Sequence, residues 1–342
     1  MPKFSKDEFA KKLMNVIPFD SKYPIESCEL VNTKKVNMTL QGITFRIKDM
    51  NISPIFYIDD LYKMYEMHDY NYPETVEEVI KTVDNVIAHT STSYAIDDCL
   101  NKNYVLQNVF PKVINTENNY DLLNTTPHKD IVNGLSCIYC INMPDIGGDR
   151  GSITINKDLM SKIGLTEKEL FNAAKDNFHV DLAPINQVLL SMSNLSDFPP
   201  ELKEKLEEES KDPHMPWVLT NEDKIFGAAS LAFPESLEDV KKTLGEDFYI
   251  LPSSIHEVLC MRESACDNIS DLENMVKSVN STEVSEKDFL SDNIFYYDGN
   301  LRNVSLENQL TKSKEIDSND EFMEEIFENN NIDMDMDWWF SK

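Results

Sequence analysis

The stretch that decides the fold is residues 248–261, FYILPSSIHEVLCM. It contains two apolar runs on either side of a proline and two serines, and short apolar runs around a turn signal are typical of buried strands. Pro252 cannot donate a ladder hydrogen bond, so we expect it at the end of the first strand. Segments with helical patterns precede and follow the stretch. It therefore predicts a pair of strands around which a sheet is built.

Size and composition indicate a globular chain of two domains. The 342 residues exceed what one hydrophobic core usually organises, and 41% of them are hydrophobic. Glycine occurs only nine times, which argues against phosphate-cradling loops. The formal net charge is −29, from 61 acidic and 32 basic residues. This charge argues against a nucleic-acid ligand and suits basic protein partners.

Nothing in the sequence indicates targeting or membrane insertion. Residues 1–13 are charged throughout and lack the apolar core of a signal peptide. No apolar run approaches the roughly 20 residues that a membrane-spanning helix needs. Six cysteines without framework spacing are typical of reduced thiols. We expect a cytoplasmic protein without membrane contact.

Residues 1–107 are predicted to form a first domain of helices and strands. Ser5 and Glu8 have the spacing of a helix capping box. Pro18 is expected to end the helix that this box begins. Three strand-like segments are followed by two helical segments, at 28–34, 36–47, 52–58, 61–67 and 74–88. Residues 91–107 carry no comparable pattern and are predicted to link the domains.

Residues 108–308 are predicted to form a second domain, in which strands and helices mix without regular βα alternation. The fold class is therefore α+β, with two mixed sheet-and-helix domains. Thr166 and Glu169 have the spacing of a second capping box. Residues 217–233 are predicted to form a hairpin of two strands. Residues 180–215 contain a mostly solvated helical stretch and are predicted to be an insertion on this domain.

Residues 309–342 are predicted to form an acidic, aromatic C-terminal tail. From Glu315 to Lys342 there are ten acidic residues and one lysine, and Trp338, Trp339 and Phe340 stand next to aspartates. Tryptophan is over-represented among interface hot spots, and flanking acids steer a segment toward basic surfaces. We expect these three aromatic residues to bind an apolar groove rimmed by Lys or Arg. The groove could belong to a partner protein or to this chain itself.

The only candidates for a catalytic site are Ser253, Ser254, His256 and Glu257. A serine beside a histidine and a carboxylate could supply a nucleophile and a base. The flanking glycines of a hydrolase elbow are absent, however. In a strand, moreover, His256 and Glu257 would point to opposite faces. We prefer a turn stabilised by serine hydroxyls and assign no catalytic residue.

No metal or cofactor site is predicted. Residues 256–260 have the zinc motif H-E-x-x-H with cysteine in place of the second histidine, but that motif requires a helix, whereas a strand is expected here. Cys137 and Cys140 have redox-motif spacing. Because residues three apart in a strand face opposite sides, we expect two buried free thiols. The glycine-rich residues 147–151 lack the Lys-Ser/Thr of a P-loop and are explained by a hairpin turn.

Several blocks of the sequence resemble a bacterial domain-of-unknown-function family, family 5688. These blocks are 106–115, 126–131, 151–170, 217–234, 247–258 and 289–298. The resemblance covers roughly residues 1–308, and its most specific block is YILPSSIHEV. A more distant likeness, through LYKMY at 61–65, is to a second uncharacterised bacterial family. Neither family has an assigned catalytic residue, so the resemblance implies the domain layout and transfers no site.

The expected function is that of a non-enzymatic protein that acts through protein–protein contacts. This expectation rests on the negative charge, on the lack of a catalytic constellation and on the aromatic tail. One alternative is a hydrolase centred on the Ser253–Glu257 turn, which a deep pocket at the hairpin would favour. The other is an acidic mimic of DNA that occupies a basic nucleic-acid-binding protein, which dense stripes of acids would favour.

Overall fold

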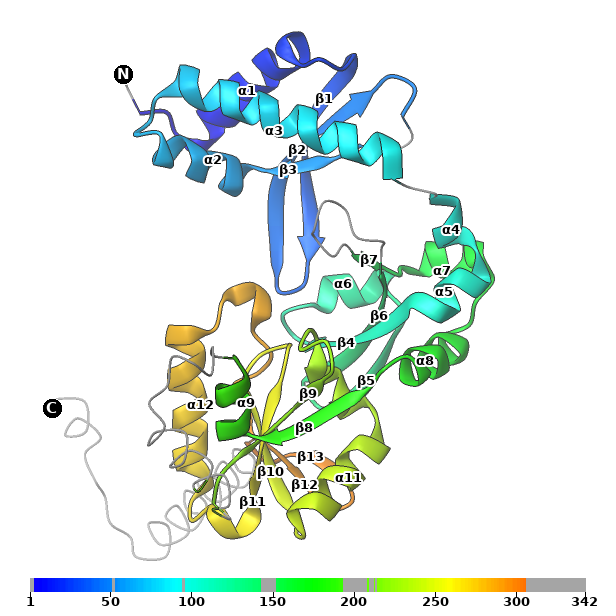
Figure 1. Ribbon diagram of the computed structural model, residues 1–342, viewed down its shortest axis with the longest axis vertical. Coiled ribbons are helices and arrows are strands. Elements are labelled where there is room, and N and C mark those ends of the chain that lie inside the picture. Colours follow the sequence, from blue (N-terminus) through cyan, green and yellow to red (C-terminus); the bar gives the residue numbers. More distant parts are fainter. Residues whose placement is uncertain are drawn as a thin grey trace, which may run out of the picture.

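The structure, a computed structural model, describes residues 3–50, 53–93, 96–142, 152–192, 208, 212 and 214–305. Its strands form a three-stranded, a four-stranded and a six-stranded sheet, and helices pack around them (Figure 1). Every strand pairing in these residues is antiparallel. The predicted α+β class is confirmed. No described helix combines the length and apolarity needed to cross a membrane.

The N-terminal unit packs three helices on the three-stranded sheet (Figure 1). The helices are α1 (Lys6–Asp20), α2 (Ile58–Met67) and α3 (Tyr72–Ser93). The strands, in the order β1-β2-β3, are β1 (Ile25–Lys35), β2 (Met38–Ile47) and β3 (Ile55–Tyr57). Their apolar faces enclose a core that is rich in aromatic rings, among them the fully buried Phe9, Phe45 and Tyr65.

Local sequence signals explain where α1 begins, but not where it ends. The predicted capping box is present, because Ser5 Oγ accepts from the Glu8 N–H and Glu8 accepts from the Ser5 N–H. The prediction that Pro18 ends the helix is wrong by two residues. Proline removes one helical hydrogen bond, yet the fully buried Ile17 anchors the last turn, and its carbonyl accepts from the Ser21 N–H.

The segment predicted as a patternless linker forms two short helices, α4 (Ile96–Leu100) and α5 (Lys102–Asn108). Asn101 caps α5 by accepting hydrogen bonds from the N–H groups of Asn103 and Tyr104. Val105 is fully buried in the core of the second half of the chain. Each helix is too short to show a periodic pattern, which is why the sequence did not reveal them.

The six-stranded sheet has the order β13-β12-β10-β11-β9-β8, with the predicted strand pair in the middle. Its strands are β8 (Val180–Pro184), β9 (Trp217–Asn221), β10 (Phe248–Pro252), β11 (Val258–Arg262), β12 (Phe295–Tyr297) and β13 (Leu301–Asn303). Pro252 is the last residue of β10, as predicted, and pairs with Val258. All five residues of β10 are buried, because both faces of this strand are covered.

The four-stranded sheet is built on β6 (Leu135–Asn142), which pairs with each of the other three strands. These are β4 (Val109–Asn115), β5 (His128–Val132) and β7 (Ser152–Thr154). This sheet and the six-stranded sheet contribute to one continuous hydrophobic core, in which Val113, Tyr139 and Phe248 are buried. The two sheets are therefore parts of a single packed body.

The remaining helices surround these two sheets. They are α6 (Tyr120–Thr125), α7 (Lys157–Ile163), α8 (Glu167–Asp176), α9 (Ile185–Met192), α11 (Pro234–Leu244) and α12 (Ile269–Glu283), with three 3-10 turns, η2 (Gly227–Ala232), η3 (Glu263–Ala265) and η4 (Glu286–Asp288). The capping box of Thr166 and Glu169 is present at α8. β8 lies at the start of the predicted insertion at 180–215, and it is an outer strand of the six-stranded sheet.

Only the first strand of the predicted hairpin at 217–233 is present. Its first strand is β9, but residues 227–232 form the buried 3-10 turn η2 instead of a second strand. Four of the six residues of η2 are glycine or alanine, so the backbone can coil close to the sheet. This close approach outweighed the apolar character that had predicted a strand.

The β1–β2 hairpin extends from the N-terminal unit onto the second half of the chain (Figure 1). Its tip residue, Asn37, is buried and adopts the left-handed conformation with φ 64°. The Asn37 N–H donates to Asn119 Oδ1, and Asn119 Nδ2 donates back to Asn37 Oδ1, each at 2.7 Å. Asn37 Nδ2 also donates to the carbonyl oxygens of Glu286 and Phe289, at 3.0 and 2.6 Å. The tip therefore fastens both α6 and η4 to the N-terminal unit.

The central position of β10 predicts a high cost for removing its core side chains. Leu251 is 5% exposed, so Leu251→Ala should lower the free energy of unfolding by about 2–5 kcal/mol in denaturant melts. Met275, which is 54% exposed on α12, provides the control, and Met275→Ala should cost less than about 1 kcal/mol. Equal costs for both variants would contradict the central placement of the strand pair.

Candidate functional site

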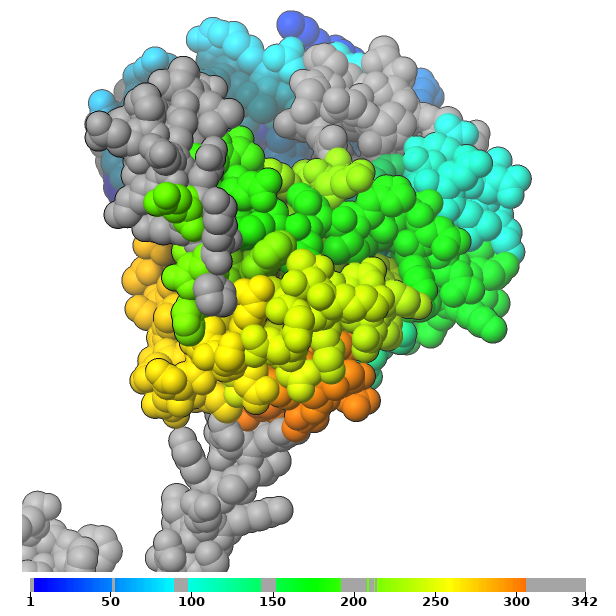
Figure 2. Space-filling model, turned by 60° about the horizontal axis from the view of Figure 1, so that its bottom comes forward, coloured from blue at the N-terminus to red at the C-terminus, as the bar shows by residue number. Residues whose placement is uncertain are grey.

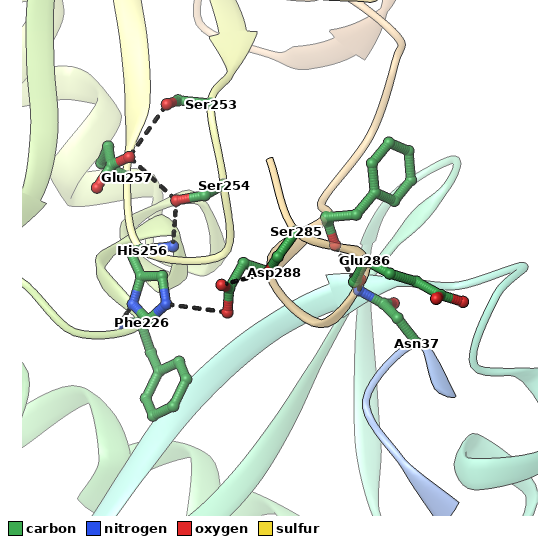
Figure 3. Close-up of polar contacts among 10 residues, drawn as sticks. Asn37, Phe226, Ser253, Ser254, His256, Glu257, Ser285, Glu286 and Asp288 are labelled. Atoms are coloured by element: carbon green, nitrogen blue, oxygen red, sulfur yellow. Dashed lines mark hydrogen bonds and ion pairs between the residues drawn. The ribbon is translucent and has the colours of Figure 1, made fainter. Parts of the chain in front are cut away.

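Three segments meet at the end of the six-stranded sheet where β10 passes into β11. They are the 253–257 turn, the 221–226 loop, which begins at the last residue of β9, and η4. Six of their residues form what we term the sheet-end cluster: Phe226, Ser253, Ser254, His256, Glu257 and Asp288 (Figure 3). The four residues considered for catalysis all belong to it.

His256 and Glu257 do not lie in a strand, contrary to the prediction. They belong to the turn between the strands, because β11 begins only at Val258. Local hydrogen bonds hold this turn: the Ser254 N–H donates to the Glu257 carbonyl at 3.1 Å, and the His256 N–H donates to Ser254 Oγ at 3.0 Å. Serine favours such turns because its hydroxyl can bond to a nearby backbone group.

The two serine hydroxyls are directed toward Glu257 (Figure 3). Ser253 Oγ and Ser254 Oγ each donate to Glu257 Oε1 at 3.0 Å. In the part of the chain that the structure describes, no hydrogen bond joins either hydroxyl to the imidazole of His256. A serine nucleophile needs a base within hydrogen-bond reach, and a carboxylate alone is a weak base for this task. The arrangement is that of a turn stabilised by serine hydroxyls.

The imidazole of His256 points away from the serines, toward Asp288 (Figure 3). Its Nδ1 accepts a hydrogen bond from the Phe226 N–H at 3.2 Å. The ring proton therefore lies on Nε2, which donates to Asp288 Oδ1 at 3.3 Å. A general base needs a ring nitrogen free to take a proton, and both nitrogens of His256 are engaged. This histidine is arranged to hold Phe226 in place.

The 221–226 loop is held in a strained conformation. Lys224 and Phe226 both have positive φ, 54° and 59°, a region that residues other than glycine seldom adopt. The Asn221 side chain fixes the loop, because it accepts from the Ile225 N–H at 3.1 Å and donates to the Ile225 carbonyl at 2.9 Å. Strain of this kind persists where the surroundings enforce it, and it is enriched at ligand-binding sites.

The ring of Phe226 stacks on two other rings. It stacks on His256 with the centroids 5.3 Å apart, and on Phe110 of β4 with the centroids 5.7 Å apart. The ammonium of Lys112 lies 4.0 Å from its centroid, within the range of a cation–π interaction. Burial lowers the pKa of Lys112. These contacts join the loop to the four-stranded sheet as well as to the turn.

A groove of about 530 Å³ lies beside this loop, and Phe226 forms part of its lining. We call it the Phe226 groove. Its volume falls in the range of known ligand sites. It lies where β4, the end of α8 and the 221–226 loop meet, and Figure 2 shows residues around 150–180 (green) beside those around 220–245 (yellow-green). Phe178, which follows α8 and lines the groove, packs on Phe233.

The lining of the Phe226 groove combines three kinds of side chain. The carboxamides of Gln107, Asn108, Asn142, Asn177 and Asn221 supply hydrogen-bonding groups. Phe110, Phe178, Ile225 and Phe226 supply apolar surface, and Glu222 and Asp223 supply negative charge. More of the described lining side chains are polar than apolar, so a ligand here would be bound through hydrogen bonds as well as through apolar contacts.

The cysteine pair with redox-motif spacing lies in the hydrophobic core. Cys137 and Cys140 are buried free thiols of β6, and burial raises the pKa of Cys137 to about 12, far from a reactive thiolate. Among the described residues, no group of three or more His, Cys, Asp or Glu side chains could hold a metal ion. The glycine-rich residues 147–151 and the aromatic residues Trp338, Trp339 and Phe340 lie outside the described residues.

Residues 6–299 match the model of a family of unknown function, DUF5688. The chain belongs to this family. The match includes the N-terminal unit, the sheet-end cluster and the whole lining of the Phe226 groove. Neither the curated proteins nor the solved structures gave a match to the chain. Membership in DUF5688 therefore supports the extent of the fold and assigns no activity.

Sequence reasoning missed Phe226 and Asp288 of the sheet-end cluster, Lys112 beside it and the lining of the Phe226 groove. Asp288 lies 32 residues beyond His256, and no motif relates the two. Phe226 stands in a segment that was predicted to be an ordinary strand. One signal could have pointed to it, because glycine at position 227, in a chain with only nine glycines, indicates a close approach of the backbone.

Gly227 provides a test of how tightly this site is built. A Cβ atom at this position would lie 2.6 Å from the Asn221 nitrogen and 2.6 Å from the His256 carbonyl oxygen, and backbone atoms cannot move aside. We expect Gly227→Ala to lower the free energy of unfolding by about 4 kcal/mol or more.

The matched control is Gly164, which has a positive φ of 74° but open space around it. Gly164→Ala should cost only about 1–2 kcal/mol, the cost of the left-handed conformation. Denaturant melts of both variants measure the difference. If Gly227→Ala lowered the free energy of unfolding no more than Gly164→Ala does, the close packing of Gly227 against the backbones of Asn221 and His256 would be wrong.

Proposed function

We propose that this DUF5688 protein is a non-enzymatic cytoplasmic protein that acts through protein–protein contacts, and that the Phe226 groove is its contact site. The observation that carries the proposal is the strained 221–226 loop, which is held by Asn221 and His256 and walls the groove. A loop held in one conformation before binding loses little entropy when a partner arrives.

The composition of the groove also supports this function. Ile225 is 38% exposed on the loop, and the half-buried Phe178 also lines the groove, so an incoming apolar side chain could bury surface against them. The surrounding carboxamides can bond to the backbone of a peptide segment. The net charge of −29 favours a basic partner.

The two alternatives receive less support from the geometry. A hydrolase at the Ser253–Glu257 turn would need a base beside a serine, whereas His256 is engaged by Phe226 and Asp288. A DNA mimic would need rows of unpaired acids. Several surface acids are instead paired with lysines, as in the contacts of Lys34 with Asp121 and of Lys175 with Glu235.

The test of the groove uses short random peptides displayed on phage and selected against the full chain. We expect binders that lose binding to Ile225→Asp, because the substitution places a charge on the apolar part of the groove. Met275→Asp, at an exposed apolar position on α12, is the matched control and should leave binding unchanged. Peptides that bind the Ile225→Asp variant as tightly as the unchanged chain would count against the groove.

A serine-hydrolase probe tests the hydrolase alternative. Covalent labelling of Ser253 or Ser254 that disappears in the His256→Ala variant would favour the hydrolase instead.

The aromatic tail is proposed as a second contact, in which Trp338, Trp339 and Phe340 enter an apolar groove of a partner with a basic rim. The proposal rests on the sequence alone. Truncation after Asn308 should then leave the melting temperature of the isolated protein nearly unchanged. A loss of several kcal/mol in stability on truncation would mean that the tail binds its own body, and the partner would be ruled out.

A further inference from the structure

We infer that the tip of the β1–β2 hairpin regulates the Phe226 groove, because its docking on the second half of the chain holds the loop that walls this groove. The inference rests on the proposed function and adds a control point to it. Asn37 at the tip does not line the groove. A series of hydrogen bonds through Asp288 and His256 joins it to Phe226, and Figure 3 shows these residues in that order.

The first link runs from the hairpin tip to η4. Asn37 Nδ2 donates to the carbonyl oxygens of Glu286 and Phe289, at 3.0 and 2.6 Å. Glu286 is the first residue of η4 and Phe289 is the residue after it, so one side chain holds the turn at both ends. None of the three residues of η4 is buried. Apolar packing therefore contributes little to the position of η4, which depends on its hydrogen bonds.

The second link runs from η4 to the 253–257 turn. Asp288, the last residue of η4, accepts from the Ile255 N–H through its backbone carbonyl at 2.9 Å. Its side-chain Oδ1 accepts from His256 Nε2 at 3.3 Å. The other carboxylate oxygen, Oδ2, accepts from Ser285 Oγ at 2.6 Å, which fixes the orientation of the carboxylate. A displacement of η4 would therefore move the acceptor away from the imidazole.

The third link runs from the imidazole to the groove wall. His256 Nδ1 accepts from the Phe226 N–H at 3.2 Å. Phe226 has a positive φ of 59°, a conformation that persists only where its surroundings enforce it. Without a fixed acceptor, the 221–226 loop would be less ordered, and a ligand would lose more entropy in ordering it. The docked tip thus favours the conformation that binds. By thermodynamic linkage, a ligand in the groove strengthens the docking of the tip by the same factor.

Two other contacts limit the size of this effect. Asn115 Nδ2 donates to the Leu290 carbonyl at 3.0 Å, so the segment after η4 keeps an anchor on β4 without the tip. The Asn221 side chain bonds to both backbone groups of Ile225 and holds the loop from its other end. Release of the tip should therefore loosen the loop without unfolding it. We expect a coupling of about fivefold, at the lower end of what allosteric sites show.

Hydrogen exchange of backbone amides, measured by NMR, tests the inference without any ligand. Asn37→Gly removes the side chain that holds η4, and glycine adopts the same positive φ without strain. The Phe226 N–H should exchange about fivefold faster in this variant. The internal reference is the N–H of the buried Leu170, which donates to the Thr166 carbonyl at the start of α8. Equal factors for both amides would mean that the variant only lowers the overall stability, and the inference would fail.

A second glycine variant controls for the change in the backbone. Asp49 is exposed, has a φ of 62° and lies at the opposite end of β2 from the tip. Asp49→Gly repeats the substitution of a positive-φ residue in the same hairpin, so it should leave the exchange of the Phe226 N–H unchanged. A rise as large as that in Asn37→Gly would also overturn the inference.

Peptides selected against the groove test the consequence for binding. Those that depend on Ile225 should bind Asn37→Gly about fivefold more weakly than the unchanged chain, and Asp49→Gly equally well. Asp288→Ala should weaken binding too, and adding Asn37→Gly to it should weaken binding little further, because both variants break one series of bonds. Additive losses would contradict this series. If no groove-dependent peptide were found, the proposed function would fail, and the exchange rates would still decide whether the tip controls the loop.

Discussion

One hydrogen bond, from the Phe226 N–H to His256 Nδ1, joins the parts of the molecule on which its candidate function depends. It determines which nitrogen of the imidazole carries the proton, and so it directs the other nitrogen to Asp288. It also satisfies the amide of a residue whose backbone is strained. Without it, the aromatic wall of the groove would lose its support from the central strand pair. A histidine in a conspicuous motif can thus serve to position a neighbour.

Features that depend on neighbouring residues could be predicted from the sequence. The capping boxes at Ser5 and Thr166 need partners only three residues away, and both are present. The strand pair at 248–262 was predictable because Pro252 ends one strand and apolar runs form both. The 3-10 turn at Gly227–Ala232 was not predictable, because its cause is the closeness of a backbone from another part of the chain. Packing at that point overrode the local preference.

The candidate site was predictable only in part. Ser253, Ser254, His256 and Glu257 were found because they are adjacent in the sequence, but their partners were not. Asp288 reaches His256 through the tertiary fold, and the residues that line the groove come from distant segments, among them α5, β4 and the loop after β9. No spacing rule links such distant segments, since their proximity is created by the sheets between them. The sequence favoured a turn held by serine hydroxyls, but it gave no sign of the contacts that His256 makes with Phe226 and Asp288.

The tip of the β1–β2 hairpin has a consequence for how the molecule unfolds. Asn37 holds the carbonyls of Glu286 and Phe289, while Asp288, between them, accepts from the Ile255 N–H and bonds to His256. Melting of the N-terminal unit would deprive these two carbonyls of their donor and the buried side chain of Asn119 of its partner. The two halves of the chain should therefore lose their structure together, in one cooperative transition, although each has its own hydrophobic core.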